Sequence, residues 1–353
     1  MKASIVIGAN YGDEGKGTVV ARLTRDSRNV LNILTNGGAQ RGHSILTKDV
    51  SMTFQHFGSG TYHGADTYYS RYYILNPMQF AEEYAILIVK PKHVYRDRRC
   101  RWTTPYDMMA NLISEEQLKR KASCGMGIWN TIKRWNSTPV LHFDDFMASP
   151  DKWPQYLKGV RQYYERQMEI PASWRDVWQS DFMVRHFLSD CMLMQTMTEV
   201  ADLSALAYDH LIFENGQGLM LKDTGEDTAD TTPSDTGISY GLRLAKDLRI
   251  KDVTAHYVTR PYLTRHGDGH LFGEQQRTSL SGGVAEDRTN HYNDHQGEFR
   301  YGQLDIRQLR DRILDDACGV KFELDVTHCD EMDREAEFRR VFGKVNLIDK
   351  ALV

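Results

Sequence analysis

The residues with the clearest chemical potential lie in one glycine-rich stretch near the start of the chain, Gly12-Asp13-Glu14-Gly15-Lys16-Gly17-Thr18. The glycines allow the backbone to approach phosphate groups, and Lys16 supplies a positive charge. An apolar run at residues 5–7 precedes this stretch, and an apolar helical pattern at 19–23 follows it. A strand, a loop and a helix in this order present backbone N–H groups at a helix start, so the sequence predicts a P-loop-like phosphate-binding loop over residues 12–18.

Asp13 is the unusual residue of this loop. A carboxylate inside a phosphate-binding loop repels its own ligand unless it binds a metal ion or accepts a proton. The loop also matches the usual P-loop pattern only in part. Asn10 stands where that pattern has glycine, and Gly17 stands where it has serine or threonine.

A second glycine-dense loop, residues 36–44, follows a strand predicted at 29–35 and carries His43. Open α/β sheets bind ligands at such strand ends. We also expect strands at 210–214, 252–258 and 320–325, and one long helical stretch at 172–198. A helix should begin at Asn76-Pro77 and run to about residue 89, because Asn caps helices and proline suits the first helical position.

These two loops resemble those of the adenylosuccinate synthetases. Residues 12–17 look like that family's signature, and residues 40–44 match its Asn-Ala-Gly-His-Thr loop at Gly42 and His43. The resemblance covers nearly the whole chain, at low identity outside the loops. It implies a single α/β domain over residues 1–353, with a mostly parallel central sheet and helices on both faces. A helical insertion around 141–207 matches none of the family's motifs.

The resemblance implies a ligase that works in two steps. Asp13 would remove the N1 proton of a 6-oxopurine nucleotide, and the 6-oxygen would attack the γ-phosphate of a nucleoside triphosphate. The amine of L-aspartate would then displace phosphate from C6. His43 would stabilise the transferring phosphoryl group, and Mg²⁺ would bind Asp13 and the Gly42 carbonyl. The implied triphosphate contacts are Gly12, Asp13, Glu14, Gly15, Lys16, Gly17, Thr18, Gly42 and Asp325.

A site for the purine monophosphate is implied in the same way. Ser123 and Cys124 fall on two threonines that hold the 5′-phosphate in the family, and Gln217 falls on the glutamine that holds the 6-oxo group. A basic pair lies near where the family sends an arginine into the partner subunit's site. The implied monophosphate contacts are Asp13, Gln40, Ser123, Cys124, Lys133, Arg134, Gln217 and Thr232.

The region that would bind aspartate departs from the family. The family has four successive arginines ahead of Thr-Gly-Trp-Leu-Asp, whereas residues 297–300 of this chain contain only Arg300. The upstream residues are rich in hydrogen-bonding groups, so we expect aspartate to contact Thr289, Asn290, Asn293, Gln296 and Arg300. Residues 263–269 resemble the family's Ser-Thr-Arg-Val-Gly-Ala-Gly loop beside the ribose.

Three functions remain open from the sequence. The altered 289–300 region resembles a bacteriophage branch of the family, the 2-aminoadenylosuccinate synthetases, which take dGMP. Glu323 replaces a lysine that covers guanine in the family, which favours ATP or dATP as the donor. The second function is an ordinary adenylosuccinate synthetase that uses IMP and GTP. The third is a nucleotide-binding switch without ligase chemistry, which Asp13 and His43 disfavour.

Composition limits the partners and the cellular compartment that we expect. The net charge of −4 and pI near 6.4 show no basic footprint, so we expect no nucleic-acid partner. Five cysteines without CxxC spacing favour a reducing cytoplasm, which would be the host's if the protein is viral. No apolar run approaches the roughly 20 residues of a membrane helix. The resemblance implies a homodimer, through the family's shared site.

Overall fold

The computed structural model describes residues 1–46, 51–119, 123–138, 148–222, 231–280, 283–284, 286–287, 290, 292 and 295–348. A parallel sheet of nine strands forms its centre. In their order across the sheet the strands are β15 (Asn346–Ile348), β14 (Phe322–Thr327), β11 (Val253–Thr259), β1 (Lys2–Gly8), β10 (His210–Gly218), β2 (Val30–Leu34), β5 (Asp66–Tyr69), β7 (Val94–Arg96) and β9 (Glu199–Val200).

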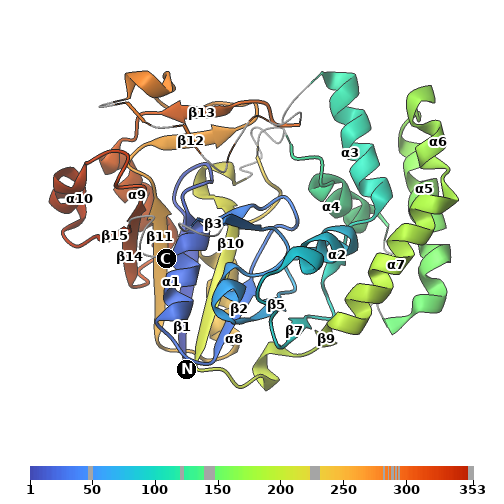
Figure 1. Ribbon diagram of the computed structural model, residues 1–353, viewed down its shortest axis with the longest axis horizontal. Coiled ribbons are helices and arrows are strands. Elements are labelled where there is room, and N and C mark those ends of the chain that lie inside the picture. The colour runs from blue at the N-terminus through green and yellow to red at the C-terminus, as the bar shows by residue number, and fades with distance from the viewer. Residues whose placement is uncertain are drawn as a thin grey trace.

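Helices cover both faces of this sheet (Figure 1). The side chains of β1 alternate between the faces, as strand geometry requires. Val6 packs with Val19 and Val20 of α1 (Lys16–Arg25) on one face. Ile5 and Ile7 join the cluster that includes α8 (Ser239–Asp247) and α9 (Ile306–Ala317) on the other. The predicted fold class, a mostly parallel α/β sheet with helices on both faces, is confirmed.

The remaining strands form three small pairs. β3 (His43–Leu46) pairs with β4 (Ser51–Phe54), and β12 (Leu263–His266) pairs with β13 (Phe299–Gly302), both antiparallel. β6 (Ile74–Leu75) pairs with β8 (Arg101–Trp102) in parallel. Figure 1 shows the β12–β13 pair lying across the edge where β1 and β10 end. The glycine loops after β1 and β2 therefore open beneath this pair.

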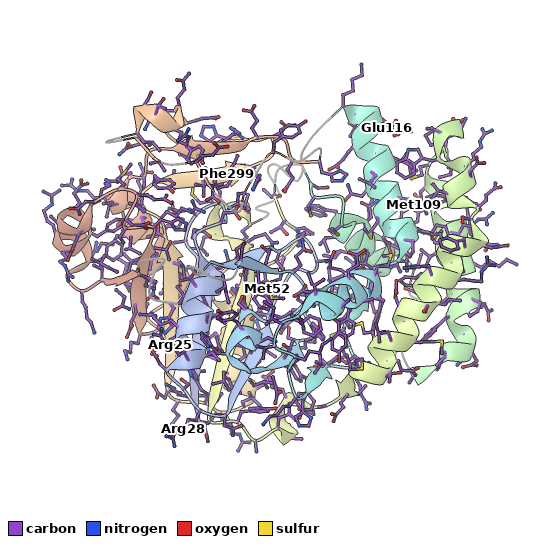
Figure 2. All side chains as sticks on the ribbon, in the orientation of Figure 1. Arg25, Arg28, Met52, Met109, Glu116 and Phe299 are labelled. Carbon is purple, nitrogen blue, oxygen red and sulfur yellow. The ribbon has the colours of Figure 1, made fainter. Side chains whose placement is uncertain are left out.

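A group of helices lies beside the sheet at the β7–β9 end (Figure 1). Its members are α2 (Pro77–Ile86), α3 (Pro105–Leu118), α4 (Ile128–Ser137), α5 (Trp153–Gln167), α6 (Arg175–Trp178) and α7 (Asp181–Met197). The side chains of Met52 and Met109, labelled in Figure 2, belong to one buried cluster that joins β4 to these helices. α10 (Glu335–Phe342) lies at the opposite end, beside α9.

Two helix predictions can be compared directly with the structure. Asn76 caps α2 as predicted, accepting from the backbone N–H groups of Met78 and Gln79 at 3.1 and 3.3 Å, although the helix ends at Ile86. The single helix predicted at 172–198 is wrong. The chain breaks after α6, because Ser180 caps a new helix by accepting from Met183 N at 3.2 Å. The described helices include none long and apolar enough to cross a membrane.

Short 3₁₀ turns connect several of these elements. They are η1 (Ser59–His63), η4 (Pro150–Lys152), η5 (Ala172–Trp174), η6 (Leu203–Ala205), η7 (Leu219–Leu221) and η8 (Arg277–Ser279).

Candidate active site

The first glycine loop turns sharply between β1 and α1. Gly12, Asp13 and Gly15 all have positive φ, at 106°, 60° and 89°, and α1 begins at Lys16. The buried Glu14 carboxylate accepts from Gly12 N and from Lys16 Nζ, each at 2.9 Å. Thr327, the last residue of β14, donates its hydroxyl to the Glu14 carbonyl at 2.6 Å. Glu14 therefore shapes the loop from within, while the loop retains the predicted strand-loop-helix geometry.

Asp13 lies half-buried at the open side of this loop. Burial raises the pKa of its carboxyl above the ordinary value of 3.8, and the neighbouring basic groups His266, Arg260 and Lys16 oppose that shift. The Arg260 Nε–H donates to the Asp13 carbonyl at 2.6 Å, which anchors the backbone beneath the carboxyl. A carboxyl with a raised pKa is a stronger base than an exposed aspartate, as a proton acceptor requires.

Gly17 brings the two glycine loops together. A Cβ atom at Gly17 would lie 2.9 Å from the Ser44 carbonyl oxygen and 3.2 Å from the His43 carbonyl carbon. β3 can therefore pack directly on the first turn of α1 only because residue 17 has no side chain. This close packing places His43 beside Lys16, and both residues line one cavity.

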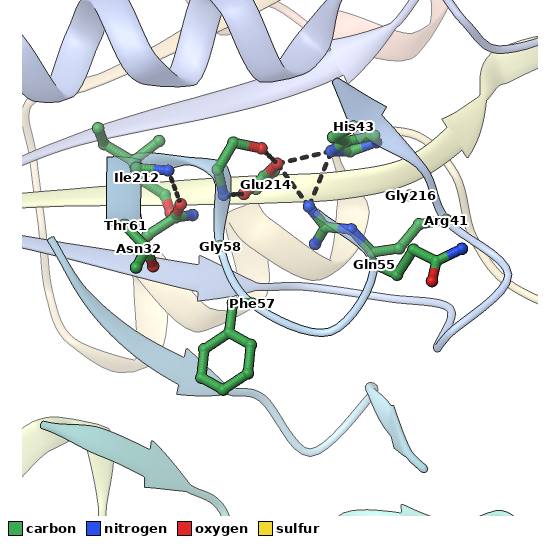
Figure 3. Close-up of polar contacts among 12 residues, drawn as sticks. Asn32, Arg41, His43, Gln55, Phe57, Gly58, Thr61, Ile212, Glu214 and Gly216 are labelled. Atoms are coloured by element: carbon green, nitrogen blue, oxygen red, sulfur yellow. Dashed lines mark hydrogen bonds and ion pairs between the residues drawn. The ribbon is translucent and has the colours of Figure 1, made fainter. Parts of the chain in front are cut away.

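His43 belongs to a buried cluster with Arg41 and Glu214 (Figure 3). Its Nδ1 lies 2.6 Å from Glu214 Oε1 and 2.8 Å from Arg41 Nη2, and Arg41 Nη2 lies 2.5 Å from the same carboxylate oxygen. Glu214 also accepts from the backbone N–H of Ser59 at 3.0 Å. Because Nδ1–H donates to Glu214, the ring orientation is fixed and Nε2 is the nitrogen left for the cavity.

Burial sets the charge state of this cluster. Burial, and then the positive charge of Arg41, lower the pKa of His43 to about 3. Burial alone would raise the pKa of Glu214, but Arg41 and the hydrogen bond from His43 hold it below its usual value. The cluster therefore contains a carboxylate, a guanidinium and a neutral imidazole. Phosphate oxygens arriving near His43 would favour its protonated form.

A cavity of about 410 Å³ lies between the two loops, and one of about 130 Å³ adjoins it. The larger cavity is lined by the predicted residues Gly12, Asp13, Lys16, Gln40, Gly42, His43, Cys124, Gln217, Asn290 and Gln296. The smaller cavity adds Ser123 and Thr232 and shares Gln40, Cys124, Gln217 and Gln296. The fold thus brings most of the predicted site together. Glu14, Gly15, Gly17 and Thr18 belong to the loop without lining the larger cavity.

Two glutamine amides face these cavities without partners. Among the described residues, nothing bonds to either amide atom of Gln40 or to the Oε1 of Gln217, although all three atoms are buried. Gln217 has a φ of 57°, and both side chains lie close to Gly37. A buried amide without a partner costs about 1–3 kcal/mol, so these groups indicate a polar ligand.

The smaller cavity ends at the start of α4. Gly127 has a φ of 65°, and a Cβ there would clash with the Asp107 carbonyl at 2.7 Å, so α4 starts tightly against α3. The Ser123 hydroxyl accepts from Gly125 N at 3.1 Å. Burial raises the pKa of the Cys124 thiol to about 11, so it stays protonated at neutral pH. Ser123 and Cys124 therefore contribute a hydroxyl-bearing and a thiol-bearing residue to the wall of this cavity.

Comparison with known proteins identifies the family of this chain. The family model "Adenylosuccinate synthetase" matches residues 5–338. The chain belongs to this family. The adenylosuccinate synthetase of Finegoldia magna is 26% identical over 327 residues, covering 88% of this chain and 75% of the relative. That of Blochmanniella pennsylvanica is 26% identical over 232 residues, covering 62% and 52%. The chain thus spans between about half and three quarters of these relatives' length.

Two solved structures share the fold. The fully ligated adenylosuccinate synthetase of Plasmodium falciparum aligns with a TM-score of 0.69 at 18% identity, over 94% of this chain and 77% of that one. The succinoaminodeoxyadenylate synthetase of cyanophage S-2L, bound to dGMP and dATP, aligns with a TM-score of 0.65 at 11% identity. That alignment covers 98% of this chain and 91% of the cyanophage chain.

The predicted contact between Arg134 and the purine monophosphate is wrong. Its guanidinium is fully buried and bonds Asp107 Oδ1 at 2.7 Å and Oδ2 at 2.9 Å, with Tyr156 OH and the Trp102 carbonyl each at 2.9 Å. Every branch of the side chain is therefore engaged inside the helical group. Lys133, one residue earlier, is exposed and lines neither cavity.

The predicted contact between Arg300 and aspartate stays a prediction, and in this structure the side chain has other partners. Its guanidinium forms a bidentate pair with Glu274 at 2.8 and 2.5 Å, and Nη1 bonds the carbonyls of Gly267 and Gly269. The pairing of β13 with β12 sets this direction, and Arg300 lines neither cavity. Thr289 and Asn293 lie outside the described residues.

Asp325 does not reach the nucleotide site either. It lies inside β14, two residues before the strand ends, and its carboxylate is fully buried. It accepts from Arg22 Nη2 at 2.6 Å, from His256 Nδ1 at 3.0 Å and from Asn346 Nδ2 at 3.1 Å. These partners occupy the carboxylate, so the predicted contact to the triphosphate is wrong.

Three residues of the site have no counterpart among the predicted ones: Arg41, Glu214 and His266. Arg41 stands where the family loop has alanine, and His266 stands where the ribose loop has valine. These two replacements of small or apolar residues by basic ones were visible in the sequence and indicated a changed cavity wall. Glu214 matches the glutamate of the family's Phe-Glu-Gly-Ala-Gln-Gly motif, which also contains the predicted residue Gln217. Its contacts with Arg41 and His43 depend on the parallel pairing of β10 with β2.

The residues of the larger cavity fit a magnesium ion, which family membership implies. The Asp13 carboxylate and the Gly42 carbonyl both line that cavity, and both are the hard oxygen ligands that Mg²⁺ prefers. The described residues contain no cluster of three or more His, Cys, Asp or Glu side chains for a metal. Phosphate oxygens and water would therefore have to supply most of the ligands, as they usually do for Mg²⁺.

Proposed function

We propose that this chain is a ligase that joins L-aspartate to C6 of dGMP, with ATP or dATP as the phosphate donor. The observation that carries this proposal is a single cavity. It brings the Asp13 carboxyl and the unpaired amides of Gln40 and Gln217 together with Lys16 and His43. The first three suit a purine edge, and the last two suit a transferring phosphate.

The proposed reaction has two steps. Asp13 takes the N1 proton, the 6-oxygen attacks the γ-phosphorus, and the bond between the γ-phosphorus and the bridging oxygen breaks to release ADP or dADP. The aspartate amine then forms a bond to C6 and loses a proton while phosphate leaves. The products are 2-amino-2′-deoxyadenylosuccinate, the nucleoside diphosphate and phosphate.

The chain's own groups stabilise charge during these steps. Lys16 and the N–H groups at the start of α1 neutralise the phosphates, and His43 faces the transferred group with Nε2. Mg²⁺, held by Asp13 and the Gly42 carbonyl, would supply further charge neutralisation. Gln217 would hold the 6-oxygen.

Two observations support dGMP as the acceptor. The cyanophage enzyme that shares this fold was solved with dGMP. Its alignment covers 98% of this chain and 91% of the cyanophage chain. Arg300, the remaining arginine of a run that reaches the ribose in the family, points to Glu274 instead. A deoxyribose has no 2′-hydroxyl and needs no such partner.

Two observations support ATP or dATP as the donor. The cyanophage enzyme was solved with dATP as its energy donor. In this chain Glu323 replaces the lysine that covers guanine in the family, and its carboxylate accepts from Asn346 Nδ2 at 2.9 Å. The replacement removes a side chain that would pack on guanine.

The second candidate is an ordinary adenylosuccinate synthetase that uses IMP and GTP. The curated relatives of this chain carry that name, which favours this alternative. Asp13 and Gln217 would serve either purine, because both purines present N1–H and a 6-oxo group.

One experiment separates these candidates. The purified protein is incubated with aspartate, Mg²⁺, each of dGMP, GMP and IMP, and each of ATP, dATP and GTP, and the products are identified by mass spectrometry. We expect aspartate incorporation with dGMP and with ATP or dATP. A preference for IMP of tenfold or more in kcat/KM would refute the dGMP proposal, and strict dependence on GTP would refute the donor proposal. Sedimentation tests the proposed homodimer.

A further inference from the structure

His266 ends β12 and lines both cavities of the site. Its Nδ1 atom is buried and bonds to none of the described residues. The residue lies on the loop that resembles the family's ribose loop, at the position of a valine. A valine there offers no polar atom, so this imidazole adds a hydrogen-bonding group to the cavity wall.

The neighbours of His266 determine which ring nitrogen carries hydrogen. Asp287 Oδ1 accepts from Asn290 Nδ2 at 3.2 Å, and Asp287 Oδ2 pairs with Arg260 Nη1 at 2.7 Å. The amide nitrogen of Asn290 therefore faces Asp287, and its oxygen faces His266 Nε2 at 3.4 Å. Since that oxygen only accepts, Nε2 must be the donor in this contact. In the neutral imidazole, Nδ1 is then a bare acceptor.

We propose that His266 Nδ1 accepts a hydrogen bond from the 2-amino group of the bound guanine and thereby selects guanine over hypoxanthine. The inference rests on the proposed function and names the residue that recognises the purine. Asp13, Gln217 and His266 line the same cavity and offer what the Watson–Crick edge of guanine requires. Gln217 donates to the 6-oxygen, Asp13 accepts from N1–H, and His266 accepts from the 2-amino group.

Hypoxanthine carries only C2–H at this position, so its binding would leave Nδ1 buried without a partner. The cost of an unsatisfied buried acceptor corresponds to roughly 5- to 100-fold in binding. The same acceptor also suits a product that keeps the 2-amino group, so recognition extends through both reaction steps.

The test compares dGMP with dIMP, which differ only in the 2-amino group. Binding of each nucleotide to the wild-type protein is measured by calorimetry without aspartate or triphosphate, and kcat/KM is measured for ligation. Three variants follow: His266→Phe keeps a ring without nitrogen, His266→Val restores the family's residue, and His266→Asn places an acceptor near the position of Nδ1. Thermal unfolding and binding of a non-hydrolysable ATP analogue confirm that each variant is folded.

We expect the wild-type protein to favour dGMP over dIMP by about tenfold or more in both measurements. His266→Phe and His266→Val should lose most of this preference through weaker use of dGMP, while His266→Asn should retain part of it. A wild-type ratio near one, or a ratio that His266→Phe leaves unchanged within twofold, would overturn the inference. If the protein gives either of these results but still ligates dGMP, the proposed function is unaffected. Selective binding of dGMP without ligation overturns only the proposed function, and a protein that binds neither nucleotide overturns both.

Discussion

Replacing Arg134 should destabilise the fold and leave nucleotide recognition nearly unchanged. In Arg134→Met the side chain keeps its apolar stem but loses both bonds to Asp107, at 2.7 and 2.9 Å. The Asp107 carboxylate then stays buried without a counter-charge. It retains donation from Thr104 N and from the Thr104 hydroxyl, each at 2.8 Å, and from Tyr164 OH at 2.7 Å, which limits the penalty.

The magnitude follows from these contacts. Removing one partner of a buried ion pair costs about 3–5 kcal/mol, and the three remaining donors favour the lower end, about 3 kcal/mol. An unfolding entropy of about 2.1 cal/mol/K per residue gives about 0.7 kcal/mol/K for 353 residues. The melting temperature should therefore fall by about 4 °C.

The assay is differential scanning calorimetry, combined with KM for the purine monophosphate measured well below the melting temperature. Asn136→Ala is the matched control, because Asn136 is an exposed residue on the same helix. We expect Asn136→Ala to change neither quantity. If Arg134→Met left the melting temperature within 1 °C of wild type and raised KM tenfold, Arg134 would be a nucleotide ligand and the present interpretation would be wrong.

Three further predictions follow from the site and its supports. Asp13→Asn should lower kcat by about 10²-fold or more with the fold retained, and near-normal turnover would remove its role as the base. Gly17→Ala should reduce kcat about tenfold, because the new Cβ would meet the Ser44 carbonyl at 2.9 Å and shift His43; unchanged kinetics would show that the contact is not needed. Burial raises the pKa of Glu83 from 4.5 to about 7, so its stabilising contribution is present below pH 4.5 and is lost as the pH rises through 7. Urea unfolding from pH 4.5 to 8 should show wild type losing stability relative to Glu83→Gln by up to about 1.4 kcal/mol per pH unit, and a pH-independent difference would contradict this.

The sequence predicted those parts of the site whose chemistry is local. Positive φ at Gly12 and Gly15 and the helix start at Lys16 follow from residue types that lie next to one another. The same holds for the cap at Asn76, since a capping side chain bonds the backbone two or three residues later. These features need no knowledge of distant segments.

The sequence did not indicate the partners of side chains whose direction depends on distant segments. Whether Arg134 faces a nucleotide or the interior depends on how α4 rotates against α3 and α5. Arg300 turns toward Glu274 because β13 pairs with β12 in one register. Asp325 was placed at a strand end, but β14 continues for two more residues. Spacing alone cannot distinguish these outcomes.

The position of β1 in the sheet has a consequence for the order in which the protein can assemble. Among the described strands, β1 pairs with β10 and β11 and with no other, and these two begin at His210 and Val253. During synthesis the ribosome makes the phosphate-binding loop before residues 210–218 and 253–259, which form the two neighbours of its strand. A nascent chain that ends before residue 210 contains the whole loop but neither of the strands that pair with β1. We therefore expect nucleotide binding to be acquired late in translation, in one step, once β10 has entered beside β1.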